Sequence, residues 1–335
     1  MRKAPIYKLL IVLLYFINTS LLSQSIANSS VAFTISERDL LPESVGYDDQ
    51  TKTFYVGSTR KGTIVKIDKE GKQSTFIESG AFGQWMIIGI KVDSERNELW
   101  FCSSGGGNLI GYLKKDETEG RPAGIFKVDL ATGKLKKKYT LETEGEVHFF
   151  NDLVIDSNGN VYATHMFSDH SIYKIEREKD ELEVFVESDI LKYPNGMDIS
   201  DDNQFLFVAH SEGIARVALQ TGKTVSLDIV NDVNITHRES IDGLYFYKNT
   251  LIGVQSDLKR ITQYQLSRPA DAIMQEKELD INHPAMDHPT TGVLIDNEFY
   301  YVANAQFEKV NEDGSLPPMH ELSEPTILKL KLEKE

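Results

Sequence analysis

A motif that recurs six times constrains the fold of this chain more than any other feature. Each copy holds an apolar stretch that ends near an Asp or Ser, a turn, and a second apolar stretch that ends in a small or polar residue. The first stretches read PESVGYD (42–48), IIGIKVD (87–93), FNDLVID (150–156), PNGMDIS (194–200), IDGLYFY (241–247) and TTGVLID (290–296). Most copies begin about 45 to 50 residues apart, which is the length of a four-stranded propeller blade.

These copies predict an all-β fold, and more narrowly a six-bladed β-propeller formed by residues 30–335 as a single domain. No long segment shows sustained helical periodicity. The sixth copy stops after its third apolar stretch, ILKLKL (327–332), whereas VAFTIS (31–36) precedes the first copy and belongs to none. We therefore expect this N-terminal strand to complete the last blade and close the ring, which removes free sheet edges.

Residues 1–25 have the pattern of a signal peptide. Arg2, Lys3 and Lys8 precede an apolar run over residues 9–17, and small residues follow it. The run is too short for a spanning helix, which needs about 20 apolar residues. An uncleaved anchor is the alternative. We expect the folded part to be exported, either periplasmic or secreted, with no membrane span once the signal has been cleaved.

The composition narrows the classes of partner. The chain has 51 Asp and Glu against 36 Lys and Arg, a net charge of −15, and the predicted leader carries three of the basic residues. This balance argues against nucleic acid and against an anionic membrane surface as partners. It is compatible with a divalent cation. The single cysteine, Cys102, excludes an intrachain disulfide.

The start of each first stretch predicts a ring of side chains on the propeller axis, because the first strand of each blade lines the central channel. The register of Asn151 holds Glu43, Ile88, Asn151, Asn195, Asp242 and Thr291. Two carboxylates and two carboxamides would converge there, and Ca²⁺ accepts such oxygens together with water. Zn²⁺ would prefer His or Cys. We predict that Glu43, Asn151, Asn195 and Asp242 bind Ca²⁺ or another divalent cation. The alternative is that they cap strand ends and bind only water.

The ends of the second stretches predict a second, wider ring at the same mouth. Its members are Ser58, Ser103, His165, His210, Gln255 and Asn304. Either histidine could act as a general base or acid near neutral pH, and Ser103, Gln255 and Asn304 are candidate substrate contacts. The alternative is that these residues hydrogen-bond neighbouring loops. His148 is a further candidate, whereas His170 and His288 fall in loops and receive no role.

Two long connections are expected to emerge at this mouth. Residues 104–123 begin SGGGNLIGY, and residues 305–325 follow the second stretch of the sixth copy. Long loops beside a site often act as lids. The glycine-rich stretch matches neither a P-loop nor a dinucleotide-binding pattern.

The motifs LPESVGYD, NDLVID, PNGMDIS and IDGLYF, in this order and spacing, resemble the SMP-30/gluconolactonase/LRE-like family and, more distantly, the paraoxonases. The resemblance covers essentially the whole chain after the leader. It implies a six-bladed propeller with a catalytic Ca²⁺, which other divalent ions can replace, that hydrolyses lactones or related esters. It also implies that Glu43, Asn195 and Asp242 are metal ligands and that Asn151 contacts metal or substrate.

One position departs from the family pattern. Members that act on sugar lactones commonly carry an arginine two residues before the asparagine of the N-D motif, where this chain has Phe149. An aromatic side chain there indicates a less polar substrate, with Phe149 itself as a contact, or no substrate at all.

We therefore expect a metal-dependent hydrolase of lactones or related esters. The cation would polarise the substrate carbonyl while water attacks it, and Asp242, His165 or His210 would take the proton. The alternative is a non-catalytic secreted propeller that binds a ligand or a protein and holds a structural cation, since propellers support many unrelated functions.

Overall fold

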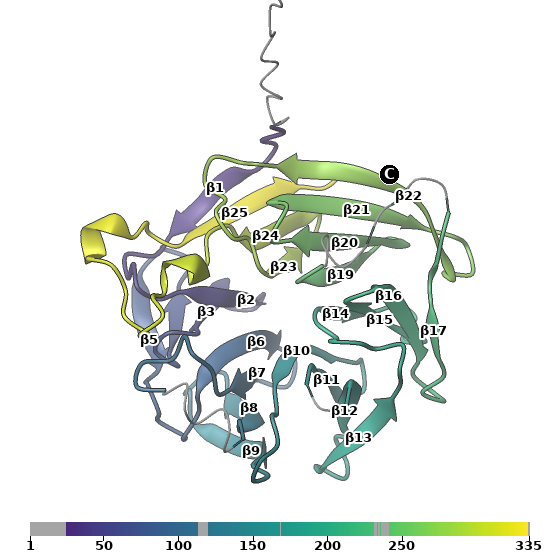
Figure 1. The fold of residues 1–335 in the computed structure, drawn as a ribbon, viewed down its shortest axis with the longest axis horizontal. Helices are drawn as coiled ribbons and strands as arrows, with labels where there is room; N and C mark the ends of the chain where they lie inside the picture. Colours follow the sequence, from purple (N-terminus) through teal and green to yellow (C-terminus); the bar gives the residue numbers. More distant parts are fainter. Residues whose placement is uncertain are drawn as a thin grey trace, which may run out of the picture.

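The computed structural model describes residues 25–112, 120–167, 169–230, 233, 235 and 241–333. Six β-sheets radiate from a central axis, as Figure 1 shows in a view along that axis. The all-β, six-bladed propeller expected from the repeats is therefore confirmed. The predicted signal peptide, apart from Ser25, lies outside the described residues.

Each sheet contains one predicted copy, and its first strand is nearest the axis. The first blade holds β2 (Pro42–Asp48), β3 (Thr53–Ser58), β4 (Ile64–Ile67) and β5 (Gln73–Ile77). The second holds β6 (Met86–Asp93), β7 (Glu98–Ser104), β8 (Ala123–Asp129) and β9 (Leu135–Leu141). The third holds β10 (Phe150–Ile155), β11 (Val161–His165), β12 (Ser171–Ile175) and β13 (Leu182–Glu187).

The second half of the ring repeats this plan with two variations. The fourth blade holds β14 (Met197–Ile199), β15 (Phe205–His210), β16 (Gly213–Ala218) and β17 (Thr224–Ser226). The fifth holds β19 (Leu244–Tyr247), β20 (Thr250–Gln255), β21 (Arg260–Leu266), β22 (Ala272–Ile281) and the short parallel β18 (Asp228–Ile229). The sixth holds β23 (Gly292–Ile295), β24 (Glu298–Val302), β25 (Thr326–Lys331) and β1 (Ser30–Thr34).

The N-terminal segment joins the last two blades. β1 pairs antiparallel with β25, so the sixth sheet contains strands from both ends of the described chain. Upstream of β1, Ile26 forms a bridge with Ile281, and Asn28 Nδ2 donates to the main-chain oxygen of Leu279 at 2.7 Å. These contacts attach the segment that directly follows the predicted leader.

The apolar core consists of six wedges between neighbouring blades. Each buried cluster takes its side chains from two adjacent sheets; Phe101 and Phe126 of the second blade, for example, pack with Tyr55 of the first. The clusters follow one another around the ring. Because alternate residues of a strand face opposite wedges, every blade contributes to two clusters.

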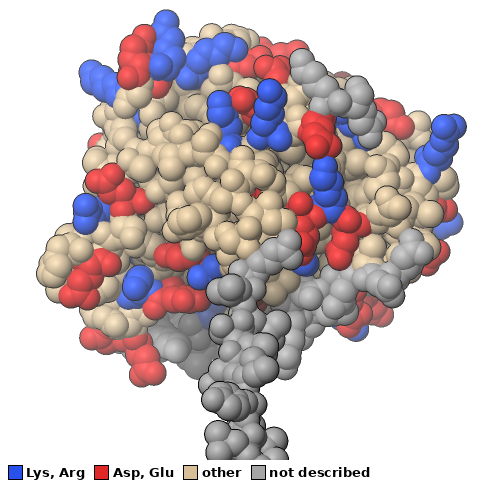
Figure 2. Space-filling view, turned by 90° about the horizontal axis from the view of Figure 1, so that it is seen from above, with Lys and Arg blue, Asp and Glu red and all other residues tan. Residues whose placement is uncertain are grey.

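The surface is charged and mixed. Acidic and basic side chains are interspersed over the edge of the disc seen in Figure 2. Two short 3₁₀ helices, η3 (Phe307–Lys309) and η4 (Met319–Glu321), lie between β24 and β25. Within the described ranges, no helix has the length and apolar character needed to cross a bilayer.

Candidate functional site

Irregular pairing at the start of the first strands turns the predicted ring residues toward the axis. The register of β2 with β3 shifts between Pro42 and Val45, and that of β10 with β11 shifts between Phe150 and Leu153. Each shift brackets a predicted ligand, Glu43 in one case and Asn151 in the other. A bulge re-aims side chains and opens the ladder locally. Asparagine at the start of this buried strand is therefore explained by the bulge.

A shared cavity, a hydrogen bond and electrostatic effects connect the four predicted ligands. Glu43 and Asn151 line the same cavity. The carboxylates of Glu43 and Asp242 are near enough to raise the pKa of Glu43, and the side chain of Asn195 donates a hydrogen bond to Asp242. The main-chain N of Gly196 also donates to the main-chain oxygen of Asp242 at 2.8 Å. The structure thus brings Glu43, Asn151, Asn195 and Asp242 together at one mouth of the axis.

Two amide oxygens in this group support the fit to a cation. Asn151 Oδ1 and Asn195 Oδ1 are buried and accept no hydrogen bond from the described protein. Buried polar atoms are nearly always paired, so two such oxygens beside two carboxylates make a donor set that suits a hard divalent cation. Nowhere in the described chain, this ring included, do three His, Cys, Asp or Glu side chains come together as a metal site, so the fit rests on two carboxylates and two amides.

The electrostatics of the two carboxylates also fit a bound cation. Burial raises the pKa of Glu43 well above its ordinary value, and the charges of Asp242 and Asp152 raise it further. Burial likewise raises the pKa of Asp242, while His288 and hydrogen bonds from Ser256 and Asn195 lower it again. Two buried carboxylates with mutual repulsion are expensive to ionise unless a positive charge joins them.

Hydrogen bonds between adjacent blades fix the ring. Thr164 Oγ1 donates to the main-chain oxygen of Asn195 at 2.9 Å, and Asp152 Oδ2 accepts from Met197 N at 3.2 Å. A Cβ on Gly196 would lie 2.1 Å from the main-chain oxygen of Asp242, so only glycine permits this approach. These contacts fix the segments that carry the predicted ligands Asn195 and Asp242 relative to each other.

The sixth position of the ring differs from the prediction by one residue. In the fifth blade, the main-chain N of Asp242 donates to β20, and the oxygen of the next residue accepts a hydrogen bond from the same residue of β20. In the sixth blade, Thr290 and Thr291 make the same pair of hydrogen bonds with β24. Thr290, and not Thr291, therefore occupies the position equivalent to Asp242. Both threonine hydroxyls donate to the main-chain oxygen of Glu43, at 2.6 and 2.9 Å.

A cavity of about 250 Å³ is lined by two of the four predicted ligands, Glu43 and Asn151. Its lining comprises Glu43, Thr59, Met86, Ile88, Gly106, Gly107, Asn108, Arg121, Phe149, Asn151 and Phe307. Both predicted long connections contribute to it, the second-blade loop through Gly106 to Asn108 and the sixth-blade segment through Phe307. Phe149 is a wall of this cavity, which agrees with its predicted place beside the ligands.

Four members of the predicted second ring hydrogen-bond neighbouring segments, three of them to main-chain atoms and Gln255 to side chains of strand β21. Ser58 Oγ donates to the oxygen of Leu40, and Ser103 Oγ accepts from the main-chain N of Trp85 at 2.7 Å. Gln255 Oε1 accepts from Arg260 Nε at 2.9 Å and from Thr262. Asn304 Oδ1 accepts from Thr326 N, and its Nδ2 donates to the oxygen of Glu324. None of these four side chains lines the 250 Å³ cavity.

His165 belongs to a buried chain of polar contacts in the third blade. Its Nε2 lies 3.2 Å from His148 Nδ1, and its Nδ1 lies 2.5 Å from Asp169 Oδ1. Ser171 and Tyr173 also donate to Asp169. Burial lowers the pKa of His148, and the neighbouring His165 lowers it further. His148, the first member of this series of contacts, stands three residues before Asn151, but neither histidine lines the cavity.

His210 is isolated in the fourth blade. Burial lowers its pKa to about 4, so the imidazole is neutral at pH 7. Its Nδ1 accepts from Glu212 N at 3.3 Å, while its Nε2 is buried without a partner in the described protein.

The structure adds His288 to the site. This residue precedes β23, its charge lowers the pKa that burial raises in Asp242, and its ring centroid lies 5.4 Å from that of Phe307 in the cavity wall. No role was expected for His288 from the sequence, because it falls in a loop. It stands two residues before Thr290, the residue equivalent to Asp242, and no motif marks it.

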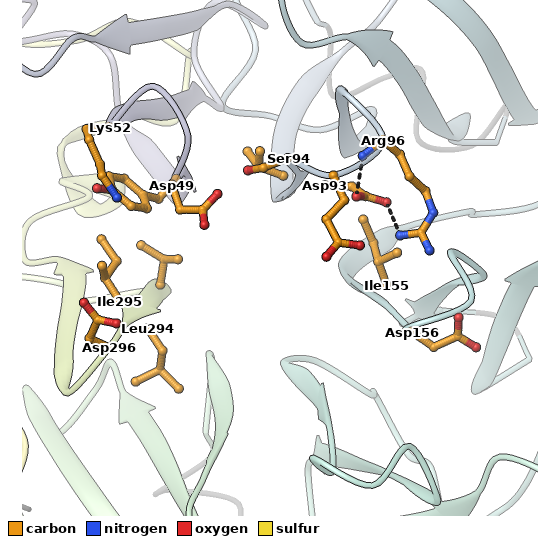
Figure 3. A pocket seen from close by; sticks show the side chains of 14 residues that line it. Asp49, Lys52, Asp93, Ser94, Arg96, Ile155, Asp156, Leu294, Ile295 and Asp296 are labelled. Carbon is orange, nitrogen blue, oxygen red and sulfur yellow. Dashed lines mark hydrogen bonds and ion pairs between the residues drawn. The ribbon is translucent and has the colours of Figure 1, made fainter.

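A larger cavity of about 560 Å³ lies at the opposite mouth (Figure 3). It is formed by the turns that follow the first strands and includes none of the predicted site residues. Two of its carboxylates, Asp93 and Asp156, are used within those turns. Asp93 pairs with Arg96 at 3.0 Å, and Asp156 Oδ1 accepts from the main-chain N atoms of Asn158 and Asn160. Local capping accounts for these residues.

Comparison with solved structures identifies the same fold in proteins with different names. The chain is similar to the Malassezia sympodialis allergen Mala s 1, with 13% identity, a TM-score of 0.66, and coverage of 92% of this chain and 97% of that chain. It is similar to a gluconolactonase of Xanthomonas campestris, with 14% identity, a TM-score of 0.57, and coverage of 92% of this chain and 89% of that chain. It is also similar to a luciferin-regenerating enzyme, with 14% identity, a TM-score of 0.58, and coverage of 90% of this chain and 94% of that chain. At these identities the likeness shows the fold alone.

The sequence itself gives the family. No curated protein matches it significantly. The SMP-30/gluconolactonase/LRE-like region matches residues 41–246, which include Glu43, Asn151, Asn195 and Asp242. The chain belongs to the SMP-30/gluconolactonase/LRE-like family.

Proposed function

We propose that this protein is a divalent-metal-dependent hydrolase, with Ca²⁺ as the first candidate ion, that opens lactones or cleaves related esters. The observation that carries the proposal is the convergence of Glu43, Asn151, Asn195 and Asp242, with two amide oxygens lacking protein partners, beside a cavity in a family that includes gluconolactonases. Periplasmic or secreted location remains part of the proposal, on the pattern of residues 1–25.

The residues of the chain divide the work. Glu43, Asn151, Asn195 and Asp242 would hold the ion, which when bound would polarise the substrate carbonyl and stabilise the charge that develops on its oxygen. The cavity walls would orient the ester group over the ligands and exclude bulk water. Hydrolysis adds water across the acyl C–O bond, so the products are an acid and an alcohol, or one hydroxy acid from a lactone.

Asp242 is the proposed proton acceptor for the attacking water. It lies two residues before β19, and Ser256 Oγ donates to its Oδ2 at 3.1 Å, which fixes the carboxylate. His288 is the histidine whose proximity lowers the pKa that burial raises in Asp242. None of Asp242, His165, His210 and His288 lines the 250 Å³ cavity. We favour Asp242 over His165 and His210, the sequence-based alternatives, because it lies beside Glu43 and Asn195.

The test is hydrolysis of a panel of aliphatic lactones, sugar lactones and aryl esters by the purified protein, with added Ca²⁺ and after chelation. We expect activity that chelation abolishes and Ca²⁺ restores. Asp242→Asn should lower kcat/KM by about 10³-fold or more, because one carboxylate serves as ligand and base. Asp296→Asn at the opposite mouth is the matched control and should leave activity unchanged. No hydrolysis of any member by the calcium-loaded protein would contradict the proposal.

The second candidate is a non-catalytic binding propeller with a structural cation. It is favoured by Phe149 in place of an arginine and by the apolar side chains of Met86, Ile88 and Phe307 in the cavity wall. In that case Asp242→Asn would lower thermal stability with no activity to lose.

A further inference from the structure

We propose that three aromatic side chains outside the metal ligands form a binding track for the apolar tail of the substrate. The aromatic row consists of Phe149, Phe167 and Tyr193, and it runs from the cavity wall toward the rim of the same mouth. This inference rests on the proposed hydrolase function and specifies its substrate class: a lactone or ester that carries an alkyl or aryl tail.

The row is continuous. The ring centroids of Phe149 and Phe167 are 5.6 Å apart with an interplanar angle of 77°, and those of Phe167 and Tyr193 are 6.2 Å apart at 76°. These are edge-to-face contacts, which aromatic rings prefer. The main-chain N of Met166 donates to the oxygen of Phe149 at 2.9 Å, which ties the two segments together. The row therefore has a defined geometry.

Its location joins the cavity to the outer surface. Phe149 lines the cavity and precedes β10, Phe167 follows β11, and Tyr193 stands two residues before the predicted ligand Asn195. Phe149 and Phe167 are partly exposed, and Tyr193 is 51% exposed. Among the described residues, Tyr193 is the one aromatic side chain in the set of exposed large hydrophobic residues.

The cavity is too small for a long substrate. Its volume of about 250 Å³ is below the range of about 300–1,000 Å³ that is usual for ligand pockets. An ester group or lactone ring fits above the metal ligands, but an attached chain has to leave the cavity. The wall at Phe149 continues into Phe167 and Tyr193, so a chain that follows this wall stays in contact with apolar surface.

The outer end of the row is held in an unusual conformation. Tyr193 has φ of 50° and His170 has φ of 49°, a region that residues other than glycine seldom occupy. Tyr193 N donates to His170 Nδ1 at 3.3 Å, and the two rings lie 5.1 Å apart. Strained positions of this kind cluster at functional sites. Here the strain presents a large ring to solvent beside the mouth.

The chemistry of the row favours hydrocarbon over sugar. Successive rings alternate edge and face, which gives a flexible chain apolar contact along its length but does not form one flat platform for a pyranose ring. The other cavity walls nearby, Met86, Ile88 and Phe307, are also apolar. Burial of hydrocarbon against such side chains supplies affinity in proportion to chain length.

The experiment compares kcat/KM for γ-butyrolactone, γ-nonalactone, γ-dodecalactone and D-glucono-δ-lactone in the wild-type protein, Phe167→Ala, Tyr193→Asn and the double variant. Asn is chosen at position 193 because it tolerates positive φ. Tyr47→Ala, which removes a half-buried tyrosine at the opposite mouth, is the matched control. Thermal melting shows that each variant is folded, and Phe167→Leu replaces Phe167→Ala if the alanine variant is not.

We expect kcat/KM in the wild type to rise with chain length, and the double variant to lose about tenfold on γ-dodecalactone with no change on γ-butyrolactone. The loss should fall mainly on KM, because tail contacts are the same in the ground and transition states. Equal effects on short and long substrates, a preference for the sugar lactone, or no effect of the variants would overturn the aromatic row while leaving the hydrolase intact. No hydrolysis of any lactone by the wild type would instead contradict the proposed function, and the aromatic row with it.

Discussion

Asn151 and Asn195 show how single side chains prepare this site. Each presents a buried amide oxygen with no partner in the described protein. An unsatisfied buried acceptor costs about 1–3 kcal/mol, which a bound cation would recover. The two carboxylates have the same need, since burial raises the pKa of both Glu43 and Asp242. A divalent ion would therefore stabilise all four of these residues.

His210 predicts a pH dependence of stability at the same scale. Burial lowers its pKa from 6.5 to about 4 in the folded protein, so between these values the unfolded chain binds a proton that the folded chain does not. Stability is therefore lost as pH falls from 6.5 toward 4. Urea unfolding should show a free energy of unfolding about 2 kcal/mol lower at pH 5 than at pH 7.5 from this residue.

The His210 prediction is checked by difference. His210→Asn should remove that part of the pH dependence, whereas His320→Asn, at a histidine whose side chain is 80% exposed, should not. An unchanged pH profile in His210→Asn would show that His210 is not the residue responsible.

At the scale of the strands, the ring depends on close contact between neighbouring blades. The inner segments of the fourth and fifth blades meet where Gly196 approaches Asp242. Thr164 and Asp152 of the third blade form hydrogen bonds with main-chain atoms of the fourth. These contacts place ligands from different blades relative to each other. A displacement of the fourth blade relative to the fifth would move Asn195 away from Asp242.

Gly196→Ala tests this contact. The added Cβ would lie 2.1 Å from the main-chain oxygen of Asp242 and 2.6 Å from the N of Leu244, so two inner strands must separate. We expect a loss of about 3 kcal/mol in the free energy of unfolding, the upper part of the range for overpacking, and weaker cation binding. Gly107→Ala, with open space around the new Cβ, is the control and should be close to neutral.

The strands also show what the sequence could and could not predict. The position of Glu43, Asn151, Asn195 and Asp242 followed from their place in the repeat, because each stands at the start of an inner strand. The sixth position moved from Thr291 to Thr290, since register within a blade is set by pairing with β24, which a short motif does not determine.

Loop-borne residues were harder to predict for a related reason. Whether a polar residue at a strand end faces the mouth or bonds a loop depends on the loop conformation. Ser103 and Asn304 were expected near the substrate, yet both bond adjacent loop backbone, and His288 reaches the neighbourhood of Asp242 from a loop without a motif. Their part in binding stays a prediction.

At the scale of the whole molecule, the six wedges of apolar packing form one closed circle, so each blade depends on two neighbours. β1 lies at the outer edge of the sixth sheet and pairs with β25. This pairing covers a strand edge that would otherwise be open to other chains.

Removal of residues 1–35 tests the role of this strand. The shortened chain should melt several degrees below one that begins at residue 25 and should aggregate more readily, because β25 becomes an exposed edge. Melting curves and light scattering on the two proteins check this. Equal Tm values and equal scattering would show that β1 is dispensable.

The central claim is that four side chains from four blades hold one divalent cation on the axis. Its most direct test is titration calorimetry with Ca²⁺, supported by elemental analysis, on the chelator-treated protein and on Glu43→Gln, Asp242→Asn and the control Asp296→Asn. The account predicts one ion per chain in the wild type and in Asp296→Asn, and little or none in the two ligand variants. No bound ion in the wild type, or an equal ion content in all four proteins, would contradict it.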